Sequence, residues 1–597
     1  MKNKKLIPII IVALIAIAGF VGYEISQTTG ELLIEKQPES AVVSYPEGAT
    51  FEVKVNKQRL VKSYQWYLED IAGNIFELQG ISAKTNKLIV PSTEQMNNEF
   101  VFYCVITDKK GNEVVTDRVT LNKDNDDENK TVLYIGEFAI EPGQTLDLST
   151  IDIGNNLKLG SGKISFDANG KDITLDNVKY DNTNMVCDYV VAPNVGLTLD
   201  VYQNEVEEYN VTFIGDNVIY NNYFDYYYNA GGIPFDFLVQ GEGVYPLVNL
   251  IGDGNLTITN GTYSIRAIGD LMVDIDITLR NDNNNYQDGI VAHNMKISEG
   301  RKLDFEISGT ALNAQGNLYI AGADIDVKSI APHISAGMVA KNVINVLYNL
   351  LIDNSDIDIM VYTDPEICQS LGTLSAINCN SDIEIYDSNI KFDIDVIKDD
   401  DIYVSNINGI TGMNILMENS NADINIDSED IFNSFGMYSE GYIQLTNSDV
   451  KVKGHTNGMT YGIAAESDFN ADESAVNVDV DSYDNYGHIG SYGIMCQNFV
   501  LKLTEANKNV RVKSNNGIAV GCNTHDHSAE YVGYTQGYEP LYQYMRENTK
   551  CSLPQNYEIS TASVVESEDE YLIVETYYDT NDLTTPAKEV SFTAGAE

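Results

Sequence analysis

Apolar and polar residues recur in a fixed order through the middle of the chain. Each copy has an apolar residue, a small polar turn centred on Ser, and then alternating apolar residues. The first copy reads IDNSDIDI at residues 352–359, and later copies centre on Ser388, Ser420, Ser448 and Ser474. Successive Ser positions lie about 26 to 33 residues apart, which indicates stacked repeats. Because a few short strands cannot bury an apolar side alone, the pattern predicts a β-solenoid.

A second recurring element is a glycine followed by an apolar residue, upstream of the Ser turn. Each coil then reads as a Gly-containing strand, a turn, an apolar pair such as Ile443 and Leu445, the Ser turn and a final strand. We expect the apolar residues to stack along the solenoid axis, and the intervening Asp, Asn and Lys to face water. The glycines are Gly289, Gly337, Gly409, Gly436, Gly462, Gly493 and Gly517.

The N-terminus has the features of an export segment. Lys2, Lys4 and Lys5 precede an apolar run at residues 6–23. The run has about 18 residues, between the length of a signal-peptide core and that of a spanning helix. We therefore expect residues 1–28 to be a signal peptide or a signal anchor, with a narrow preference for an uncleaved anchor whose positive end stays inside. This predicts an extracellular, cell-surface protein that meets the membrane only through this segment.

Residues 30–122 have a different pattern, with short alternating strands, turn signals and the only Trp of the chain, Trp66. The region resembles a bacterial immunoglobulin-like domain, in which a Trp packs in the sandwich core and a Cys, here Cys104, lies on a late strand. No Cys precedes Trp66, so we expect Phe51 or Val53 to fill the space of the missing disulfide. The resemblance implies a spacer or an adhesive module, and we favour a stalk.

The remaining boundaries follow from composition. Residues 123–131 form an acidic linker with no large apolar side chain, so we expect it to be exposed. The predicted solenoid occupies residues 132–545, and residues 546–597 are expected to be a C-terminal cap or extension. The seven Cys are scattered and odd in number, which is not a disulfide framework. A formal net charge of -51 excludes nucleic acid as a partner.

Two segments of the predicted solenoid, residues 214–219 and 252–265, have the pattern Gly-Asp, Asn, then alternating apolar residues. They resemble exported right-handed parallel β-helix proteins of Gram-positive bacteria that are described as carbohydrate-binding or pectate-lyase-like. The resemblance implies an all-β fold, with an immunoglobulin-like sandwich followed by a right-handed parallel β-helix. It also implies an extracellular glycan or a surface protein as the partner, but its motifs are structural and name no ligand.

Clustered Tyr residues are the candidate ligand-binding surface. Tyr suits sugar rings and protein contacts because it combines an apolar face with a hydroxyl at low entropic cost. A second group, around residues 531–544, lies near the C-terminal end, and packing over the ends of the solenoid explains both groups equally well. The candidate ligand-binding residues are Tyr220, Tyr223, Tyr226, Tyr227 and Tyr228.

Pairs of Asp two residues apart are the candidate metal ligands. Residues two apart in a strand share a face, so each pair can offer two carboxylates to calcium. Ladders of Asn and Ser at matching turns are the competing interpretation of these many polar residues, and we favour the ladders. The pairs are Asp274 with Asp276, Asp324 with Asp326, and Asp356 with Asp358.

The sequence has no recognisable catalytic arrangement. The motifs expected of polysaccharide lyases and hydrolases are absent, and a carboxylate cluster beside Arg266 or Arg280 would be needed to favour an enzyme. We therefore expect a cell-surface binding or adhesion protein that recognises a polysaccharide through the β-helix, and not an enzyme. A lyase or glycoside hydrolase with an unrecognised site is the first alternative, and a structural surface-layer component is the second.

Overall fold

The structure is a computed structural model of the 597-residue chain. The expected signal anchor lies outside the residues that it describes. Within the described residues, no helix is long and apolar enough to cross a membrane. The described residues are 31–44, 49–69, 75–78, 82–90, 101–124, 132–135, 138–153, 157–181, 197–202, 208–221, 224–225, 230–231, 235–240, 246–261, 263–282, 287–331, 341–363, 371–396, 404–428, 431–482, 490–503, 508–515, 517–522, 557–559, 562–569, 572–579, 582–586 and 589–594.

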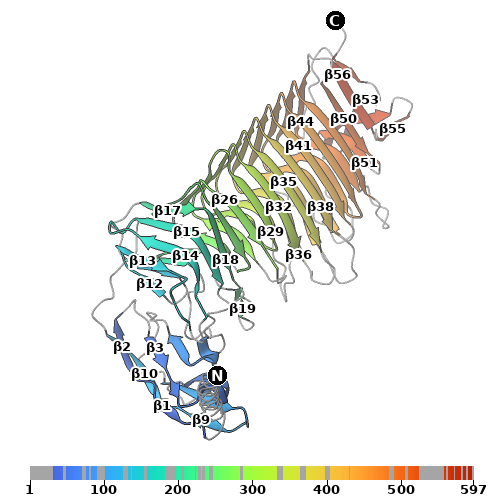
Figure 1. Ribbon diagram of the computed structural model, residues 1–597. Helices are drawn as coiled ribbons and strands as arrows, with labels where there is room; N and C mark the ends of the chain where they lie inside the picture. The colour runs from blue at the N-terminus through green and yellow to red at the C-terminus, as the bar shows by residue number, and fades with distance from the viewer. Residues whose placement is uncertain are drawn as a thin grey trace, which may run out of the picture. The chain divides into compact units, whose positions relative to one another are not determined.

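Contacts divide the chain into two compact units. The first contains residues 1–203 with two short later segments, and the second contains most of the chain from residue 204 onward. Both units are built from β-strands (Figure 1). The chain is therefore all-β, as the sequence predicted, while the domain boundaries expected from composition stay predictions.

The N-terminal part of the first unit is a mostly antiparallel β structure, in which β10 pairs with β2 in parallel. Its central pair is β5 (Val61–Glu69) with β8 (Val101–Asp108), in which Trp66 lies opposite Cys104. The same sheet contains β2, β10, β6 and β9, and a separate pair is formed by β3 and β7. Their bounds are β2 (Ala41–Ser44), β3 (Ala49–Glu52), β6 (Ile75–Glu77), β7 (Lys87–Val90), β9 (Glu113–Val115) and β10 (Val119–Asp124).

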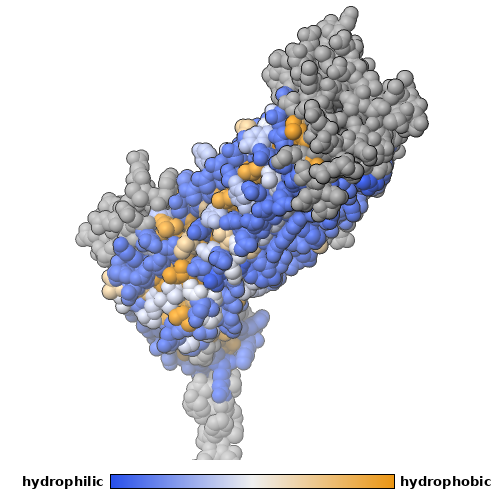
Figure 2. All heavy atoms as spheres, turned by 90° about the horizontal axis from the view of Figure 1, so that it is seen from above, coloured by the Kyte–Doolittle hydropathy of each residue, from blue (hydrophilic) through white to orange (hydrophobic). Residues whose placement is uncertain are grey.

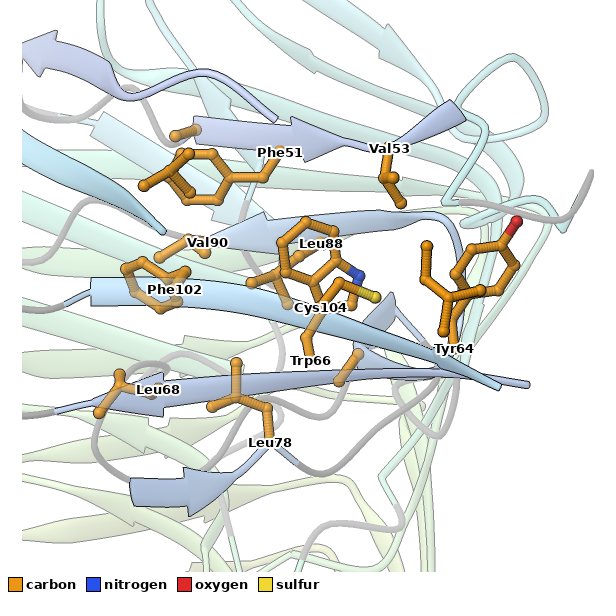
Figure 3. Packing of buried hydrophobic residues seen from close by; sticks show 14 of the residues in the cluster. Phe51, Val53, Tyr64, Trp66, Leu68, Leu78, Leu88, Val90, Phe102 and Cys104 are labelled. Atoms are coloured by element: carbon orange, nitrogen blue, oxygen red, sulfur yellow. The ribbon is translucent and has the colours of Figure 1, made fainter. Parts of the chain in front are cut away.

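Aromatic side chains form the core between these two groups of strands (Figure 3). The Trp66 indole N–H donates a hydrogen bond to the backbone carbonyl of Thr85 at 2.9 Å, which satisfies the one polar atom of the ring. Phe51 stacks on Phe102 with ring centroids 5.4 Å apart. Phe51 and Val53 are both fully buried beside Trp66, as expected for a core without a disulfide. The immunoglobulin-like assignment itself stays a prediction.

The rest of the first unit is also mostly antiparallel. Strand β11 (Val132–Ile135) pairs with β12 (Phe138–Ile140) and β16 (Leu197–Tyr202). A second group is formed by β13, β14 and β15, which pair in sequence order. Their bounds are β13 (Gln144–Asp147), β14 (Gly160–Phe166) and β15 (Asp172–Asp181).

The second unit is a parallel β-helix, in which each coil has three strands. Equivalent strands of successive coils pair in parallel and in register, and Figure 1 shows them stacked in chain order from green to orange. Three sheets result. The first contains β34, the second contains β35 and the third contains β36, which are the successive strands of one coil. The fold predicted from the recurring Ser turns is thus confirmed.

The strands of each sheet are as follows. The first sheet has β25 (Asp270–Val273), β28 (Met295–Ile297), β31 (Leu318–Ala321), β34 (Leu350–Asp353), β37 (Asp382–Tyr386), β40 (Asn414–Glu418), β43 (Ile443–Thr446), β46 (Asp468–Asp472) and β49 (Asn498–Lys502). The second has β26 (Asp276–Arg280), β29 (Lys302–Ile307), β32 (Asp324–Ala331), β35 (Asp356–Thr363), β38 (Asn389–Val396), β41 (Asn421–Ser428), β44 (Asp449–Thr456), β47 (Ala475–Ser482) and β50 (Asn509–Ser514). The third has β24 (Tyr263–Ala267), β27 (Asp288–Ala292), β30 (Leu312–Ala314), β33 (Lys341–Val346), β36 (Leu371–Cys379), β39 (Val404–Gly412), β42 (Ile431–Ser439), β45 (Met459–Ala465), β48 (Ser491–Cys496) and β51 (Gly517–Cys522).

The predicted Ser turn joins the first sheet to the second in five successive coils. The residue before the Ser has a positive φ, 52° at Asn419 for example, which lets the chain turn sharply. The Ser420 hydroxyl donates to the backbone carbonyl of Glu418 at 2.7 Å and accepts the backbone N–H of Ser388 at 3.2 Å. Ser448 accepts the N–H of Ser420 in the same way, at 3.2 Å. The Ser ladder expected from the sequence is therefore present and links each coil to the next.

The recurring glycines lie where the third sheet packs directly against the second. A Cβ on Gly436 would approach a Val452 methyl to 2.3 Å and the backbone oxygen of Gly462 to 2.5 Å, so no larger residue fits. The prediction is wrong at Gly517, which pairs with Ser491. Ala519 takes the equivalent position, because its backbone oxygen lies 2.3 Å from where a Cβ of Gly493 would be. Gly337 lies outside the described residues.

The last coil pairs with strands from the C-terminal region. Strand β56 (Glu589–Ala594) pairs antiparallel with β50, and β54 (Leu572–Asp579) pairs antiparallel with β51. Antiparallel pairing of this kind covers the open edges of a parallel stack, which would otherwise offer unpaired backbone groups. The other strands of this region are β52 (Tyr557–Ile559), β53 (Ala562–Asp569) and β55 (Asp582–Pro586).

Candidate functional site

The outward residues of the second sheet form two rows that run across its strands. Alternate residues of a strand point to opposite faces, so positions one and three of each strand share the outer face. In-register pairing then stacks equivalent positions of successive coils. Row 1 contains Asp324, Asp356, Asn389, Asn421 and Asp449, and row 2 contains Asp326, Asp358, Lys391, Asp423, Lys451, Asn477 and Arg511.

A groove of about 360 Å³ lies over these two rows, and its lining extends from β32 to β44. A second groove of about 260 Å³ shares Asp449 and Lys451 with the first and extends to Asn509 and Arg511 on β50. Together they follow the direction in which the coils stack. We call the two adjoining grooves together the second-sheet groove. A linear ligand lying in it would cross one strand after another.

Row 1 is held by hydrogen bonds between coils. The Asn389 side-chain amide donates to the Asp356 carboxylate at 2.7 Å, and the Asn421 amide donates to the Asn389 carbonyl oxygen at 2.7 Å. Farther along, the Lys508 ammonium lies 2.9 Å from the Asp449 carboxylate. These contacts fix the positions of the oxygen atoms that line one side of the groove. The sequence predicted Asn ladders at the turns. In row 1, an Asn ladder also connects the first residues of successive strands.

Row 2 contains both paired and unpaired charges. The Lys391 ammonium lies 2.8 Å from the Asp358 carboxylate, and this hydrogen bond is the main reason why the pKa of Lys391 is raised. Asp423 and Lys451, in the next two coils, are exposed. Neither side chain forms a hydrogen bond or an ion pair with another residue in the described part of the chain. The middle of the groove therefore offers one acceptor and one donor to a ligand.

A carboxylate-rich strip lies beside the groove on β38 and β41. Burial raises the pKa of Asp395, and the negative charges of Asp427 and Asp393 raise it further. Asp427 is the register partner of Asp395 in the next coil. The Asn425 amide donates to Asp393 at 2.9 Å, so that carboxylate is partly satisfied. This strip makes the surroundings of the groove strongly negative.

The structure places the predicted calcium ligands on the outer face of the second sheet or just before it, where cations and N–H groups contact them. In the first pair, Asp274 accepts from the Arg301 guanidinium at 2.9 Å and Asp276 from the backbone N–H of Lys302 at 2.9 Å. The second pair, Asp324 and Asp326, shares the Lys302 ammonium at 3.5 and 3.1 Å.

The third pair, Asp356 and Asp358, lines the groove and accepts from Asn389 and Lys391, as described above. Among the described residues, no group of three or more Asp, Glu, His or Cys is arranged to hold a metal ion. Each Asp pair was expected to share a face. In the second pair, Asp324 and Asp326 both contact the Lys302 ammonium from the same face. The calcium site stays a prediction.

The predicted Tyr surface is mostly outside the described residues. Tyr220 ends β18 (Asp216–Tyr220) and is half-buried. Tyr223, Tyr226, Tyr227 and Tyr228 lie outside the described residues, as do the Tyr residues around 531–544. Their role in ligand binding stays a prediction.

Carboxylates do lie beside Arg280, which was the condition set for an enzyme. The Arg280 guanidinium binds Asp304 through two nitrogens, at 3.0 and 2.8 Å. Glu306, in the same strand, pairs with Lys328 at 2.6 Å. Each of these carboxylates is paired with a cation, whereas glycoside hydrolysis uses two carboxyl groups that face one glycosidic bond. This cluster therefore has the features of an ion-pair network and not of an acid–base pair.

Sequence reasoning missed the central groove residues Asn389, Lys391, Asn421, Asp423 and Lys451. Each follows a recurring Ser turn by one or three positions, so aligning the copies on that Ser would have stacked them. The signal was present, but it was used to derive the fold and not the outer face.

Comparison with known proteins adds little to this geometry. The chain matches no protein-family model and no curated protein. Among solved structures it is similar to SGBP-B of the Bacteroides ovatus mixed-linkage glucan utilization locus, determined in complex with a mixed-linkage heptasaccharide. The identity is 12%, the TM-score is 0.13, and the match covers 32% of this chain and 52% of that one, about half its length. A TM-score of this size supports no conclusion about this chain.

Proposed function

We propose that the β-helix binds an extracellular polysaccharide whose chain lies along the second-sheet groove. The observation that supports this most is that the two adjoining grooves together cover the successive strands of the second sheet from β32 to β50. A polymer, unlike a small compact ligand, can occupy such a feature along its whole length. Polar side chains alternate in the groove as acceptors and donors, which suits a ligand rich in hydroxyl groups.

The spacing of the coils supports an extended sugar chain. Adjacent strands of a sheet lie about 4.7–4.9 Å apart, which is close to the advance of one sugar in an extended polysaccharide. Each coil can therefore meet one sugar with the same two positions, one from row 1 and one from row 2. In the middle of the groove these are Asn421 with Asp423 and Asp449 with Lys451. Repetition of modest contacts is the way such a surface gains affinity.

The cellular setting is part of the proposal. The positively charged, apolar N-terminus would export the chain and hold it at the cell surface. The N-terminal β structure, which we propose is immunoglobulin-like, would act as a stalk for the β-helix. The net charge of -51 would keep the protein away from anionic lipid and leave the groove available to glycans.

A glycan array probed with the chain from Gly30 onward, with and without calcium, tests the proposal. The groove variant is Asp423→Ala with Lys451→Ala, and the matched control is Asp167→Ala with Lys158→Ala, which removes the same charges from exposed sites in the first unit. We expect saturable binding of an intact polysaccharide that the groove variant loses and the control keeps. Calcium dependence would support the predicted Asp ligands.

Two other outcomes would overturn the proposal. Shortened glycan products would show that the protein is a lyase or hydrolase. Absence of binding to any glycan would favour adhesion to a protein or a structural role in a surface layer.

A further inference from the structure

Exposed hydrophobic side chains gather at one corner of the β-helix, where the third sheet passes into the first. Leu347 is 42% exposed, Tyr348 59%, Met413 40% and Tyr442 40%. They belong to the turns that precede β34, β40 and β43, within four successive coils. Figure 2, which shows one side of the surface, has hydrophobic residues scattered between hydrophilic ones. A group of exposed apolar side chains at one place, such as these four at the corner, is typical of an interaction site.

The adjoining face of the first sheet extends this apolar surface. Tyr319, Leu351 and Leu416 point outward from β31, β34 and β40 and are half-buried. The strand register places four residues in one row, one from each successive coil. In order, they are Tyr319, Leu351, Glu384 and Leu416. We call the whole surface the corner patch. It consists of Tyr319, Leu347, Tyr348, Leu351, Met413, Leu416 and Tyr442.

The turns that hold the patch are well fixed. The Cys379 thiol donates to the backbone carbonyl of Tyr348 at 2.7 Å. The Asn414 amide donates to the Asp382 carboxylate at 2.7 Å, and the backbone N–H of Tyr442 donates to the Asn414 carbonyl oxygen at 3.2 Å. A partner would therefore meet an ordered surface and would not have to order it on binding.

The charge around the patch is mostly negative. The five segments of the corner and first sheet, at residues 315–323, 347–355, 380–388, 413–420 and 440–448, contain no Lys, Arg or His. They contain Asp353, Asp382, Glu384, Asp387, Glu418 and Glu440. Burial, then Glu384 and Glu418, raise the pKa of the Tyr386 hydroxyl, as expected where negative charges have no nearby cation.

We propose that the corner patch binds a protein partner whose contact surface combines aliphatic side chains with Lys or Arg. The aliphatic groups would cover the exposed rings and chains, and the cations would meet the surrounding carboxylates. Tyr faces also attract cations, and the patch has an internal example: the Lys296 ammonium lies 5.6 Å from the centre of the Tyr319 ring. A neutral sugar can stack on the rings and donate its hydroxyls to the carboxylates, but it does not neutralise their charge, so charge favours a basic protein.

Binding of two synthetic peptides to the full-length protein in detergent tests this proposal. One peptide contains lysine and leucine, and the other contains lysine and serine at the same length and charge. The patch variant is Tyr348→Ser with Tyr442→Ser, and the control is Met360→Ser, an exposed hydrophobic residue of the second sheet. We expect the lysine–leucine peptide to bind more tightly than its partner and to lose about tenfold in affinity on the patch variant alone.

The charge requirement has its own variant, Glu384→Gln with Glu418→Gln. It should weaken binding and reduce its dependence on salt. Equal affinity for the two peptides would overturn the proposal, because charge alone would then explain binding. An unchanged affinity on the patch variant would also overturn it. Neither outcome bears on polysaccharide binding in the groove.

Discussion

The outer faces of the first and second sheets differ, although the same coils build both. On the second sheet, cations alternate with carboxylates and most are paired across coils, as Lys391 is with Asp358. On the first sheet and the turns that precede it, Tyr, Leu and Met are exposed or half-buried and the charges nearby are mostly negative. The buried faces of both sheets are similar rows of Ile, Val and Leu. The difference shows that the repeat specifies the fold through its inward residues and leaves each outer face free to take its own chemistry.

Overpacking the contact between the second and third sheets should have the largest effect on stability. Gly436→Val would force methyl groups into Val452 and the backbone of Gly462, so we expect a loss of about 3 kcal/mol in the free energy of unfolding, the upper end of the usual cost of overpacking. Denaturant unfolding measures it. Gln444→Val, on the exposed face of the first sheet, is the control and should change little. A stable Gly436→Val protein would mean that the two sheets are not in direct contact there.

Breaking the turn that separates the two faces should have a smaller effect. Ser420→Ala removes a buried hydroxyl that donates to the Glu418 carbonyl and accepts the Ser388 N–H. The Ser388 N–H then loses this partner, whereas the Glu418 carbonyl still accepts the N–H of Asp387. The expected loss is about 1–3 kcal/mol. Ser381→Ala, at a half-buried turn without this ladder, is the matched control. Equal effects of the two substitutions would show that the Ser ladder does not stabilise the stack.

Removing a charge from the groove should hardly affect stability. The Lys391 and Asp358 side chains are about half exposed, so Lys391→Met should change the free energy of unfolding by less than about 1 kcal/mol. The same variant should weaken polysaccharide binding, because it removes a donor from row 2. Comparing unfolding curves with binding curves of this one variant distinguishes a ligand contact from a structural one. A large loss of stability would identify the ion pair as structural.

The smallest effect concerns pH. The folded protein has a raised pKa at Asp395, so the folded state binds the proton more tightly than the unfolded state. The charged carboxylate therefore costs stability once the pH exceeds the unfolded value, and the cost is absent at lower pH. We expect Asp395→Asn to stabilise the protein slightly near neutral pH and to have no effect in acid. Thermal unfolding at both pH values measures this, and stabilisation confined to acid would contradict the assigned direction.

The sequence predicted the stack well because its signals are local. The Ser turn needs one residue that tolerates a positive φ, followed by a hydroxyl, and Asn354 with Ser355 and Asn419 with Ser420 show both in the sequence. The glycine prediction was wrong at Gly517 because a Gly-Ile pair alone does not give the register.

The groove could not be predicted in the same way. Its contacts join residues whose separation changes from coil to coil, since 33 residues separate Lys391 from Asp358 and 59 separate Lys508 from Asp449. The Asp pairs were read from single strands, whereas the cations that meet them, Arg301, Lys302 and Lys391, belong to neighbouring coils. Only a known register brings these charges together.

Hydrogen–deuterium exchange with and without a bound polysaccharide tests the central claim most directly. The account predicts that the ligand slows exchange in β38, β41 and β44, around Asn389, Asn421 and Asp449, and leaves the first sheet unchanged. Slowed exchange confined to the corner patch, or no change anywhere in the β-helix, would contradict the assignment of the groove as the binding site.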